Sequence, residues 1–468
     1  MSRPRGGTDW TTLGVATLQP RRPRADSPDV TVSRRPAASL LSLALVVLSV
    51  VGLTAPAAAD VPALPGAVAP LPAGPAVPDT PTVGLTGPAA GAALGLRVER
   101  ALAAAGATTI AAAVDVEGFD AVLRRSAERS LPPASTQKSF TGLSALVALG
   151  PMARFRTRVV TDRAPVRGRL RGSVWLVAGG DPYLTGTDLR ALARQVRAAG
   201  IVSVSGGVRV DDSRYDRRRT AGGWRRSFMP GQSGPLSALA VDRNTWRRDP
   251  AFLADPAVPM AVRFRDLLRA AGVTVTGGVT RAPAPVASRQ LAVKVSAPLP
   301  VVVRRALKDS DNFASELLLK EVGRVVTGRG SSLAGVAATR QVLGGLGVTV
   351  GASADGSGLS STDRQTPAGQ LQLLRAADLS GVGPAFRAAL PVGCGDGTLR
   401  RRFCGTPAAG RVMAKTGTLS GVRALAGYTT TASGRQVWFA FQLTGVTDGA
   451  RALRAMDRAV VLLASAPE

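Results

Sequence analysis

The sequence has 468 residues, enough for two or three domains with a full hydrophobic core. Its 59 lysines and arginines outnumber its 31 aspartates and glutamates, the formal net charge is +28, and it contains two cysteines and no histidine. These counts exclude Ser-His-Asp triads, Cys-His dyads and structural zinc sites. Because the arginines are scattered rather than interleaved with aromatic residues, we expect attraction to anionic wall polymers or a membrane surface, and no specific nucleic-acid recognition.

Residues 1–59 are predicted to be a secretory signal peptide. Arg34 and Arg35 precede an apolar run at 40–53, and the alanines at 57–59 offer a cleavage site of small residues. This run is short for a membrane span, so we expect export by the general secretory route to an extracellular or periplasmic, wall-associated location, with the mature protein soluble or peripherally attached to the membrane. Residues 60–92 are rich in Pro, Ala and Gly and nearly uncharged, which predicts a linker.

Hydrophobic periodicity predicts the elements that follow in chain order. In the first part these are a helix from residue 96, a strand at 108–116, a helix at 135–149, strands at 155–160, 173–177 and 204–210, and helices at 189–199 and 263–271. In the second part they are a helix at 307–326 interrupted at Gly323, a strand from 412, a hairpin of 422–430 and 436–443 around Ser433-Gly434, and a helix at 450–464. Residues 158–285 are predicted to form a small domain inserted into a larger one made of 93–157 and 286–468.

The stretch from Pro132 to Lys138 combines a turn with the start of a helix. Pro132 and Pro133 suit the entrance of a helix, and Ser135 and Lys138 are spaced to lie on one face. A serine hydroxyl is a weak nucleophile until a base takes its proton, and a neutral amine is such a base. The positive end of the helix dipole favours the neutral form of Lys138. By itself this spacing is also typical of an ordinary helix start.

Lysine is scarce in this chain, which makes each one informative. The five lysines are Lys138, Lys294, Lys308, Lys320 and Lys415, and every other basic side chain is arginine. Arginine cannot act as a base in a protein, whereas a buried lysine can lose its proton. Lys138 and Lys415 both fall in short motifs, which favours chemistry over chance for these two.

Two further motifs follow in a fixed order. Ser310-Asp311-Asn312 precedes the apolar positions of a helix, and Lys415-Thr416-Gly417-Thr418 lies on the strand before the hairpin. Each alone is usually a solvated cap or turn, but a serine–lysine pair followed by both motifs indicates a serine acyl-transfer site.

With these three motifs the sequence resembles the penicillin-binding proteins and serine β-lactamases. Within that group it is most similar to the D-alanyl-D-alanine carboxypeptidase/endopeptidases of peptidase family S13, over about residues 94–465. Further shared segments are 149–151 (Leu-Gly-Pro), 179–182 (Gly-Gly-Asp-Pro), 210–214 (Val-Asp-Asp-Ser-Arg), 308–312 (Lys-Asp-Ser-Asp-Asn), 355–360 (Asp-Gly-Ser-Gly-Leu-Ser) and 396–399 (Asp-Gly-Thr-Leu). The resemblance implies an α/β (α+β) serine β-lactamase/DD-peptidase-like transpeptidase fold, with a smaller inserted domain between the first and second motifs.

The resemblance also implies roles for individual residues. Ser135 is expected to attack the D-Ala-D-Ala carbonyl of peptidoglycan peptides, or a β-lactam, with Lys138 as base. Lys415 is expected to be a second cation that, with Ser310 and Asn312, keeps Lys138 neutral and relays protons. The backbone N–H groups of Ser135 and Thr418 are expected to form the oxyanion hole. The remaining candidate substrate-binding residues are Thr416, Gly417, Thr418, Ser357, Leu359 and Trp224. No cofactor and no metal are expected.

Two features depart from the family pattern. The interval from Ser135 to Ser310 has room for one inserted domain, whereas larger members carry two. Where members of this branch place acidic residues after a tryptophan to hold a diamino acid, Trp224 is followed by Arg225-Arg226-Ser227, which argues against recognition of a free stem amine.

Cys394 and Cys404 are ten residues apart in the segment before Lys415. In an exported protein a disulfide is expected, and the alternative is two unpaired thiols without a catalytic role.

Two other functions fit parts of this pattern. A class A β-lactamase uses a loop glutamate to activate the deacylating water. Between Asn312 and Lys415 the only glutamates are Glu316 and Glu321, both on the predicted helix, so we expect slow release of penicillin. A catalytically silent wall-binding protein is the other alternative, and the intact motif residues argue against it.

Overall fold

The computed structural model describes residues 88–119, 121–245 and 249–467. The predicted signal peptide and the stretch 60–87 of the predicted linker lie outside these ranges. The linker prediction is wrong at its end, because helix α1 (Pro88–Ala103) already begins at Pro88. Within the described ranges no helix is both long enough and apolar enough to cross a bilayer.

The main sheet is antiparallel and joins the two ends of the described chain. Its strand order is β11-β12-β13-β1-β2, so β11 forms one edge. The strands are β1 (Thr109–Val116), β2 (Leu123–Arg125), β11 (Met413–Leu419), β12 (Val422–Thr430) and β13 (Gln436–Thr444). The predicted hairpin is therefore confirmed as β12 and β13, with its turn at residues 431–435.

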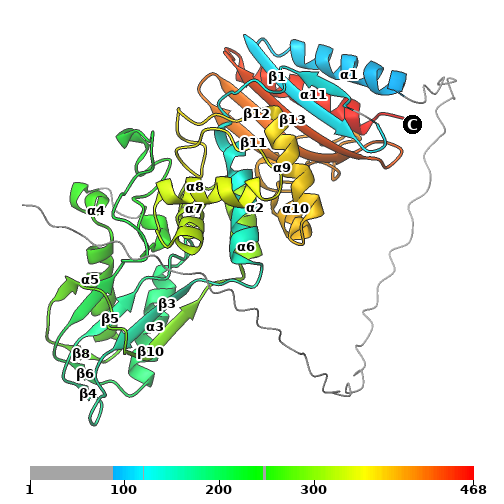
Figure 1. The fold of residues 1–468 in the computed structure, drawn as a ribbon. Coiled ribbons are helices and arrows are strands. Elements are labelled where there is room, and N and C mark those ends of the chain that lie inside the picture. Colours follow the sequence, from blue (N-terminus) through cyan, green and yellow to red (C-terminus); the bar gives the residue numbers. More distant parts are fainter. Residues whose placement is uncertain (1–87, 120, 246–248, 468) are drawn as a thin grey trace, which may run out of the picture. The chain divides into compact units, whose positions relative to one another are not determined.

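Helices cover both faces of this sheet (Figure 1). Phe439 and Phe441 of β13 pack on one face with α1 and α11 (Gly449–Ala464). Ala440, which alternates with them, belongs to the core on the other face, where α9 (Pro367–Leu379) lies. This alternation is what a strand buried on both sides requires. The helix predicted at 450–464 is confirmed as α11, which buries Met456, Val460 and Leu463 in the core on the side of α1.

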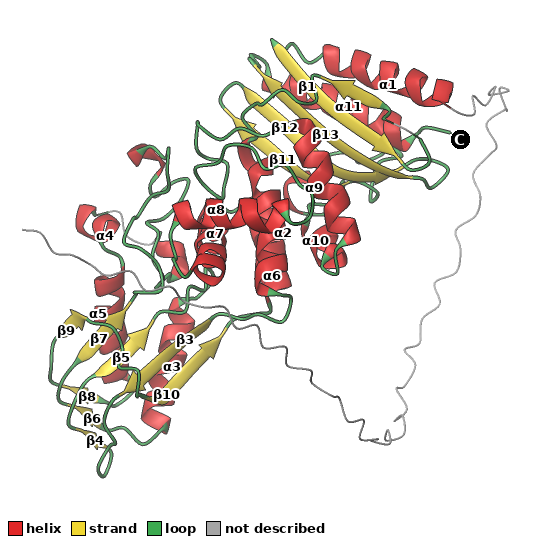
Figure 2. Cartoon of the chain, viewed as in Figure 1, coloured by secondary structure: helices red, strands yellow, loops and turns green. Residues whose placement is uncertain are grey.

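A helical layer lies beside the sheet (Figure 2) and holds the residues of the first two motifs, while the third motif lies on β11. Its central helix is α2 (Gln137–Leu149), which continues from a short 3₁₀ turn, η1 (Ala134–Thr136), and buries Phe140, Leu143 and Leu146. The helices around it are α6 (Leu299–Lys308), α7 (Asn312–Thr327), α8 (Ser332–Gly344) and α10 (Gly383–Ala389).

The segment 156–295 carries two further sheets around a separate core, and we call it the inserted segment. One sheet has the order β10-β3-β5-β7-β9 and the other β4-β6-β8. The strands are β3 (Arg156–Thr161), β4 (Arg169–Leu170), β5 (Val174–Val177), β6 (Ser203–Val204), β7 (Val208–Asp211), β8 (Thr274–Val275), β9 (Val279–Arg281) and β10 (Arg289–Val295). The helices are α3 (Gly186–Ala198), α4 (Pro250–Ala254) and α5 (Ala257–Ala270).

The structure corrects two predicted elements. The helix predicted at 307–326 is two helices, α6 and α7, which separate at residues 309–311, where Ser310 has φ 53°. Gly323 does not interrupt α7, and a Cβ there would lie 2.6 Å from the backbone nitrogen of Gly335, so the glycine permits close packing of α8. The strand predicted at 204–210 divides into β6 and β7, because Gly207 turns the chain with φ 83°.

Candidate active site

Ser135 and Lys138 lie one turn apart where η1 passes into α2. The Lys138 Nζ is 2.9 Å from the Ser135 Oγ, 2.7 Å from the Asn312 Oδ1 and 2.6 Å from the Ser357 carbonyl oxygen. The amide and carbonyl oxygens can only accept, whereas the serine hydroxyl can also donate. A neutral Lys138 therefore donates hydrogen bonds to Asn312 and Ser357 and accepts one from the Ser135 hydroxyl, which prepares it to take the serine proton.

The backbone around the serine is strained. Ala134, which precedes it, has φ 47°, and Ser310 has φ 53°; both are left-handed values that cost free energy for residues other than glycine. Gly358 packs against this turn so closely that a Cβ would lie 1.8 Å from the Ala134 carbonyl oxygen. The loop 355–360 and the serine turn therefore fix each other's position.

Lys415 forms a second buried amine site. Its Nζ donates to the Ser310 Oγ at 3.0 Å and to its neighbour Thr416's carbonyl oxygen at 2.9 Å. Both lysines are fully buried. The second and third motifs thus meet at the hydroxyl of Ser310, and the first and second meet at the side chain of Asn312.

Burial lowers the pKa of Lys138 to about 8. Four carboxylates oppose this by favouring the ammonium, in the order Asp355, Asp311, Glu316 and Asp363. Burial is the first cause of the shift, and the expected role of Lys415 in keeping Lys138 neutral stays a prediction. Burial, followed by repulsion from Lys138, holds the pKa of Lys415 well below its usual range.

Two of these carboxyl groups are themselves shifted towards the neutral form. Burial, followed by the charge of Asp355, raises the pKa of Glu316 to about 7 and that of Asp363 to about 10. Asp363 is therefore protonated at neutral pH, and its Oδ1 accepts from the Ala354 N–H at 2.7 Å. Glu316 accepts from the Gly356 N–H at 2.8 Å.

Asp355 is the acceptor that organises the loop above these groups. Its Oδ1 accepts the backbone N–H groups of Ser357 and Gly358 at 3.1 and 2.7 Å. Its Oδ2 accepts from the Ser357 hydroxyl and the Trp224 Nε1, at 2.8 and 2.5 Å, and from two more backbone N–H groups, of residues 359 and 360. Because the Ser357 carbonyl contacts Lys138, this carboxylate positions one partner of the amine.

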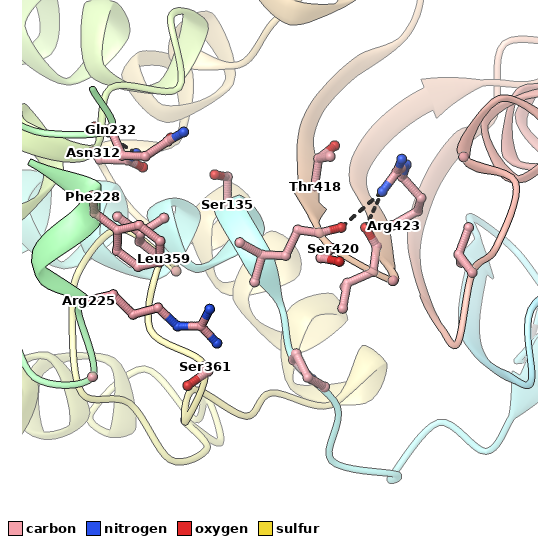
Figure 3. A pocket seen from close by; sticks show the side chains of 18 of the residues that line it. Ser135, Arg225, Phe228, Gln232, Asn312, Leu359, Ser361, Thr418, Ser420 and Arg423 are labelled. Atoms are coloured by element: carbon pink, nitrogen blue, oxygen red, sulfur yellow. Dashed lines mark hydrogen bonds between the residues drawn. The ribbon is translucent and has the colours of Figure 1, made fainter. Parts of the chain in front are cut away.

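A cavity of about 840 Å³ opens beside Ser135 (Figure 3). Residues from all three motifs and from the inserted segment surround it. Those used below are Ser135, Arg225, Phe228, Gln232, Asn312, Leu359, Ser361, Thr418, Ser420 and Arg423. The inserted segment is held here by the Asn312 Nδ2, which donates to the Gln232 carbonyl oxygen at 3.0 Å.

The remaining predicted binding residues occupy different places. Thr418 and Leu359 line the cavity, whereas Ser357 is buried beneath it. The Thr416 hydroxyl donates to the Thr398 hydroxyl at 2.9 Å. A Cβ on Gly417 would lie 2.7 Å from the Pro133 carbonyl oxygen, so this glycine lets β11 pack on the serine turn.

Trp224 is not among the described residues that line the cavity; its indole is directed at Asp355 and packs on the core of the inserted segment.

Outside the cavity, the predicted disulfide between Cys394 and Cys404 is confirmed. In the described part of the chain, no three His, Cys, Asp or Glu side chains lie close enough together to hold a metal ion.

The structure adds groups that the sequence did not single out. They are the carboxyl groups of Asp355, Glu316 and Asp363, which act on Lys138 or on the loop beside it. Asp355 opens a motif quoted above, and an aspartate before Gly-Ser-Gly is a signal for a side chain that caps its own loop. Nothing in the sequence places Glu316 or Asp363 near Lys138.

Comparison with known proteins agrees with this geometry. A model of the D-Ala-D-Ala carboxypeptidase 3 (S13) family matches residues 98–251 and 248–466. The D-alanyl-D-alanine carboxypeptidase of Actinomadura sp. (strain R39) is 30% identical over 404 residues, which cover 69% of this chain and 75% of that protein. Carboxypeptidase Rv3627c of Mycobacterium tuberculosis is 34% identical over 334 residues, 66% of this chain and 70% of that protein.

Among solved structures, penicillin binding protein 4 (dacB) from Haemophilus influenzae superposes with a TM-score of 0.71 at 22% identity, over 78% of this chain and 98% of that one. This likeness confirms the predicted fold class.

Proposed function

Because the chain belongs to the D-Ala-D-Ala carboxypeptidase 3 (S13) family, we propose that it removes the terminal D-alanine of peptidoglycan stem peptides through an acyl-enzyme on Ser135. The observation that carries this assignment to a residue is the 2.9 Å contact between the Lys138 Nζ and the Ser135 Oγ. A positioned base within hydrogen-bond reach of a serine is what nucleophilic catalysis needs.

In the acylation step, neutral Lys138 takes the proton of the Ser135 hydroxyl. The Oγ then forms a bond with the carbonyl carbon of the penultimate D-alanine. As the peptide C–N bond breaks, the nitrogen of the leaving D-alanine needs a proton. Lys138, which holds the proton taken from Ser135, supplies it together with Lys415 and Ser310. The Ser310 hydroxyl accepts a hydrogen bond from the Lys415 Nζ at 3.0 Å, so these two groups can relay the proton.

In the deacylation step, water attacks the ester carbonyl. Lys138 receives one proton of the water, the ester C–O bond breaks, and the Ser135 oxygen regains its proton. The developing oxyanion in both steps is assigned to the backbone N–H groups of Ser135 and Thr418, which both border the cavity. One such donor is typically worth about 3 kcal/mol in the transition state.

The terminal carboxylate of the substrate is assigned to the end of β11 that carries Lys415, Thr416 and Thr418. An arriving carboxylate favours the ammonium form of Lys415, whose pKa is otherwise depressed by burial. Substrate binding is thus coupled to proton uptake at Lys415.

Penicillin is expected to acylate Ser135 and to leave slowly. The structure places Glu316 on α7, fully buried and bonded to the Gly356 N–H, and Glu321 is held by Arg214 at 2.6 Å. Neither is among the described residues that line the cavity, so neither is placed to activate a deacylating water. This favours a penicillin-binding peptidase over a β-lactamase.

We also assign the protein to the exterior of the cell, where the positive charge favours anionic wall polymers or a membrane surface. The test of function is digestion of defined muropeptides by the purified protein, with products identified by mass. Loss of one D-alanine from a pentapeptide supports the carboxypeptidase, and cleavage of a cross-linked dimer adds an endopeptidase. Neither product appearing, or both persisting in Ser135→Ala, contradicts the proposal.

A further inference from the structure

The charged side chains found in the described lining of the cavity beside Ser135 are all positive. Among the described residues that line it, the charged ones are Arg225 and Arg423, and none is an aspartate or glutamate. Figure 3 shows the two arginines on opposite sides of the cavity, with the Arg225 guanidinium directed into it. An all-cationic cavity attracts an anionic group and repels an ammonium.

The two arginines are not equally available. Arg423 donates to the backbone carbonyl oxygens of Leu419 and Val422, at 3.0 and 2.8 Å, and is thereby fixed. Arg225 is exposed and makes no ion pair or side-chain hydrogen bond within the described part of the chain. By contrast, Arg243 of the same segment is bound to Asp311 at 2.9 Å. Among the described residues that line this cavity, Arg225 is therefore the free cation.

The backbone that carries Arg225 is anchored on both sides. Trp224, its neighbour, is bound to Asp355, and Gln232 is bound to Asn312. These contacts join the segment to residues that also contact or organise Lys138. A charge carried here has a defined location relative to Ser135.

The position of the cavity along β11 indicates which part of the substrate it receives. It borders β11 from Thr418 onwards and continues over Ser420 to Arg423, away from Lys415. If the terminal carboxylate of the substrate lies at the Lys415 end, the cavity receives the opposite, acyl-side part of the peptide. Phe228 and Leu359 add apolar walls on the side of Arg225.

We infer that Arg225 is a specificity-determining residue that binds a carboxylate on the side chain of the residue preceding D-Ala-D-Ala. This inference rests on the proposed function. It names the class of stem peptide that the enzyme selects: those whose side chain at that position bears a free carboxylate, in preference to those that bear only an amine or whose carboxylate is amidated.

The test uses three penicillins that share a ring system and a phenyl side chain. Benzylpenicillin has a neutral side chain, carbenicillin adds a carboxylate, and ampicillin adds an amine. The second-order rate of acylation is measured for each with the wild type, Arg225→Glu and Arg226→Glu. Arg226 is the matched control, because it is exposed and adjacent but is not among the described cavity-lining residues.

We expect the wild type to prefer carbenicillin to ampicillin, and Arg225→Glu to lower this rate ratio by about tenfold or more at low salt. Arg226→Glu should change it by less than about twofold. Circular dichroism of both variants, together with benzylpenicillin adducts that still form on Ser135, shows that the fold and the nucleophile are intact, and the rate ratio removes any effect common to all three penicillins. A pair of synthetic stem peptides, identical except for an acid or amide at that side chain, should show the same dependence on Arg225.

The inference is overturned if the ratio is unaffected by Arg225→Glu, or if Arg226→Glu lowers it equally, since the effect would then be long-range charge. It is also overturned if the acid and amide peptides are cut equally well. If none of the three penicillins acylates the wild type, the proposed function itself fails, which is a different result from acylation without selectivity.

Discussion

The two buried lysines of the active site differ in the charges around them. Both are fully buried, and burial lowers the pKa of each. Lys138 is faced by acidic side chains, led by Asp355, which restore part of its preference for the ammonium and leave its pKa at about 8. The charge found to act on Lys415 is the repulsive one of Lys138, and its pKa lies well below the usual range.

This difference shows how one fold prepares two amines for two tasks. A base with a pKa near 8 keeps a neutral fraction of roughly one tenth at pH 7, compared with less than about one thousandth for an ordinary lysine, and it is still basic enough to take a proton from serine. An amine that is neutral in the empty site and becomes charged when a carboxylate arrives is suited to substrate binding. The carboxylates beneath Lys138 therefore tune the base, and removing them one at a time tests the comparison.

The largest effect is expected for Lys138→Arg, which keeps the positive charge and removes the ability to accept a proton. Acylation by penicillin should fall by at least about a hundredfold, the usual contribution of a positioned base. The measurement is the acylation rate of the folded variant, with circular dichroism to verify the fold. Lys294→Arg, on the inserted segment and paired with Asp188 at 2.6 Å, is the control and should react normally. A near-normal rate for Lys138→Arg would mean that another group is the base.

The next largest effect is expected for Asp355→Asn. The substitution replaces one of the two carboxylate oxygens of residue 355 with an NH₂ group. This group faces backbone N–H groups of the loop 355–360, which then lose their acceptor. We expect a loss of about 2 kcal/mol in unfolding free energy. We also expect about tenfold slower acylation, because the Ser357 carbonyl no longer holds Lys138 in place. Denaturant titration and acylation kinetics on the same sample measure both. A stable variant with unchanged kinetics would show that the loop needs no carboxylate.

A smaller effect is expected on the pH dependence of acylation. If neutral Lys138 is the base, the rate rises about tenfold per pH unit below its pKa and levels off above about 8. Glu316 raises the pKa of Lys138, so Glu316→Gln should move the midpoint to lower pH, by roughly half a unit. Glu321→Gln, on the same helix but not found to act on Lys138, should leave the midpoint in place. A midpoint that rises in Glu316→Gln would contradict the electrostatic account.

The smallest effect is expected for Asp363→Asn. Asp363 has a pKa of about 10, so it is protonated at neutral pH: one oxygen accepts from the Ala354 N–H, and the other can carry the proton. An asparagine side chain supplies the same donor and the same acceptor. At neutral pH the unfolding free energy should therefore change by less than about 0.5 kcal/mol, and the acylation rate by less than about twofold. A loss as large as that of Asp355→Asn would mean that Asp363 is ionised.

Much of the site could be predicted from local sequence. Ser135 with Lys138, Ser310 with Asn312, and Lys415 are each recognisable in short motifs, and the hairpin after Lys415 follows from alternation and its turn. These features depend on neighbours within a few residues, which a sequence displays directly.

The rest depends on contacts between distant segments. Helix α7 begins five residues later than predicted, after the polar run 308–312, because the left-handed backbone at Ser310, which tertiary packing fixes, separates it from α6. Glu316 looks like an ordinary helix position, and only the fold brings it beneath a loop 40 residues away. The sequence shows Arg225 as a departure after Trp224, but only the fold shows that it has no partner among the described residues and lies at a cavity whose described charged lining is entirely basic.

The central claim is that Ser135 is the nucleophile and Lys138 its base. The most direct measurement is mass analysis of the protein after brief exposure to benzylpenicillin, followed by digestion and location of the adduct. We predict one adduct per chain, on the peptide that contains Ser135, with none in Ser135→Ala and markedly slower formation in Lys138→Arg. An adduct on any other residue, or none on the folded wild-type protein, would contradict the account.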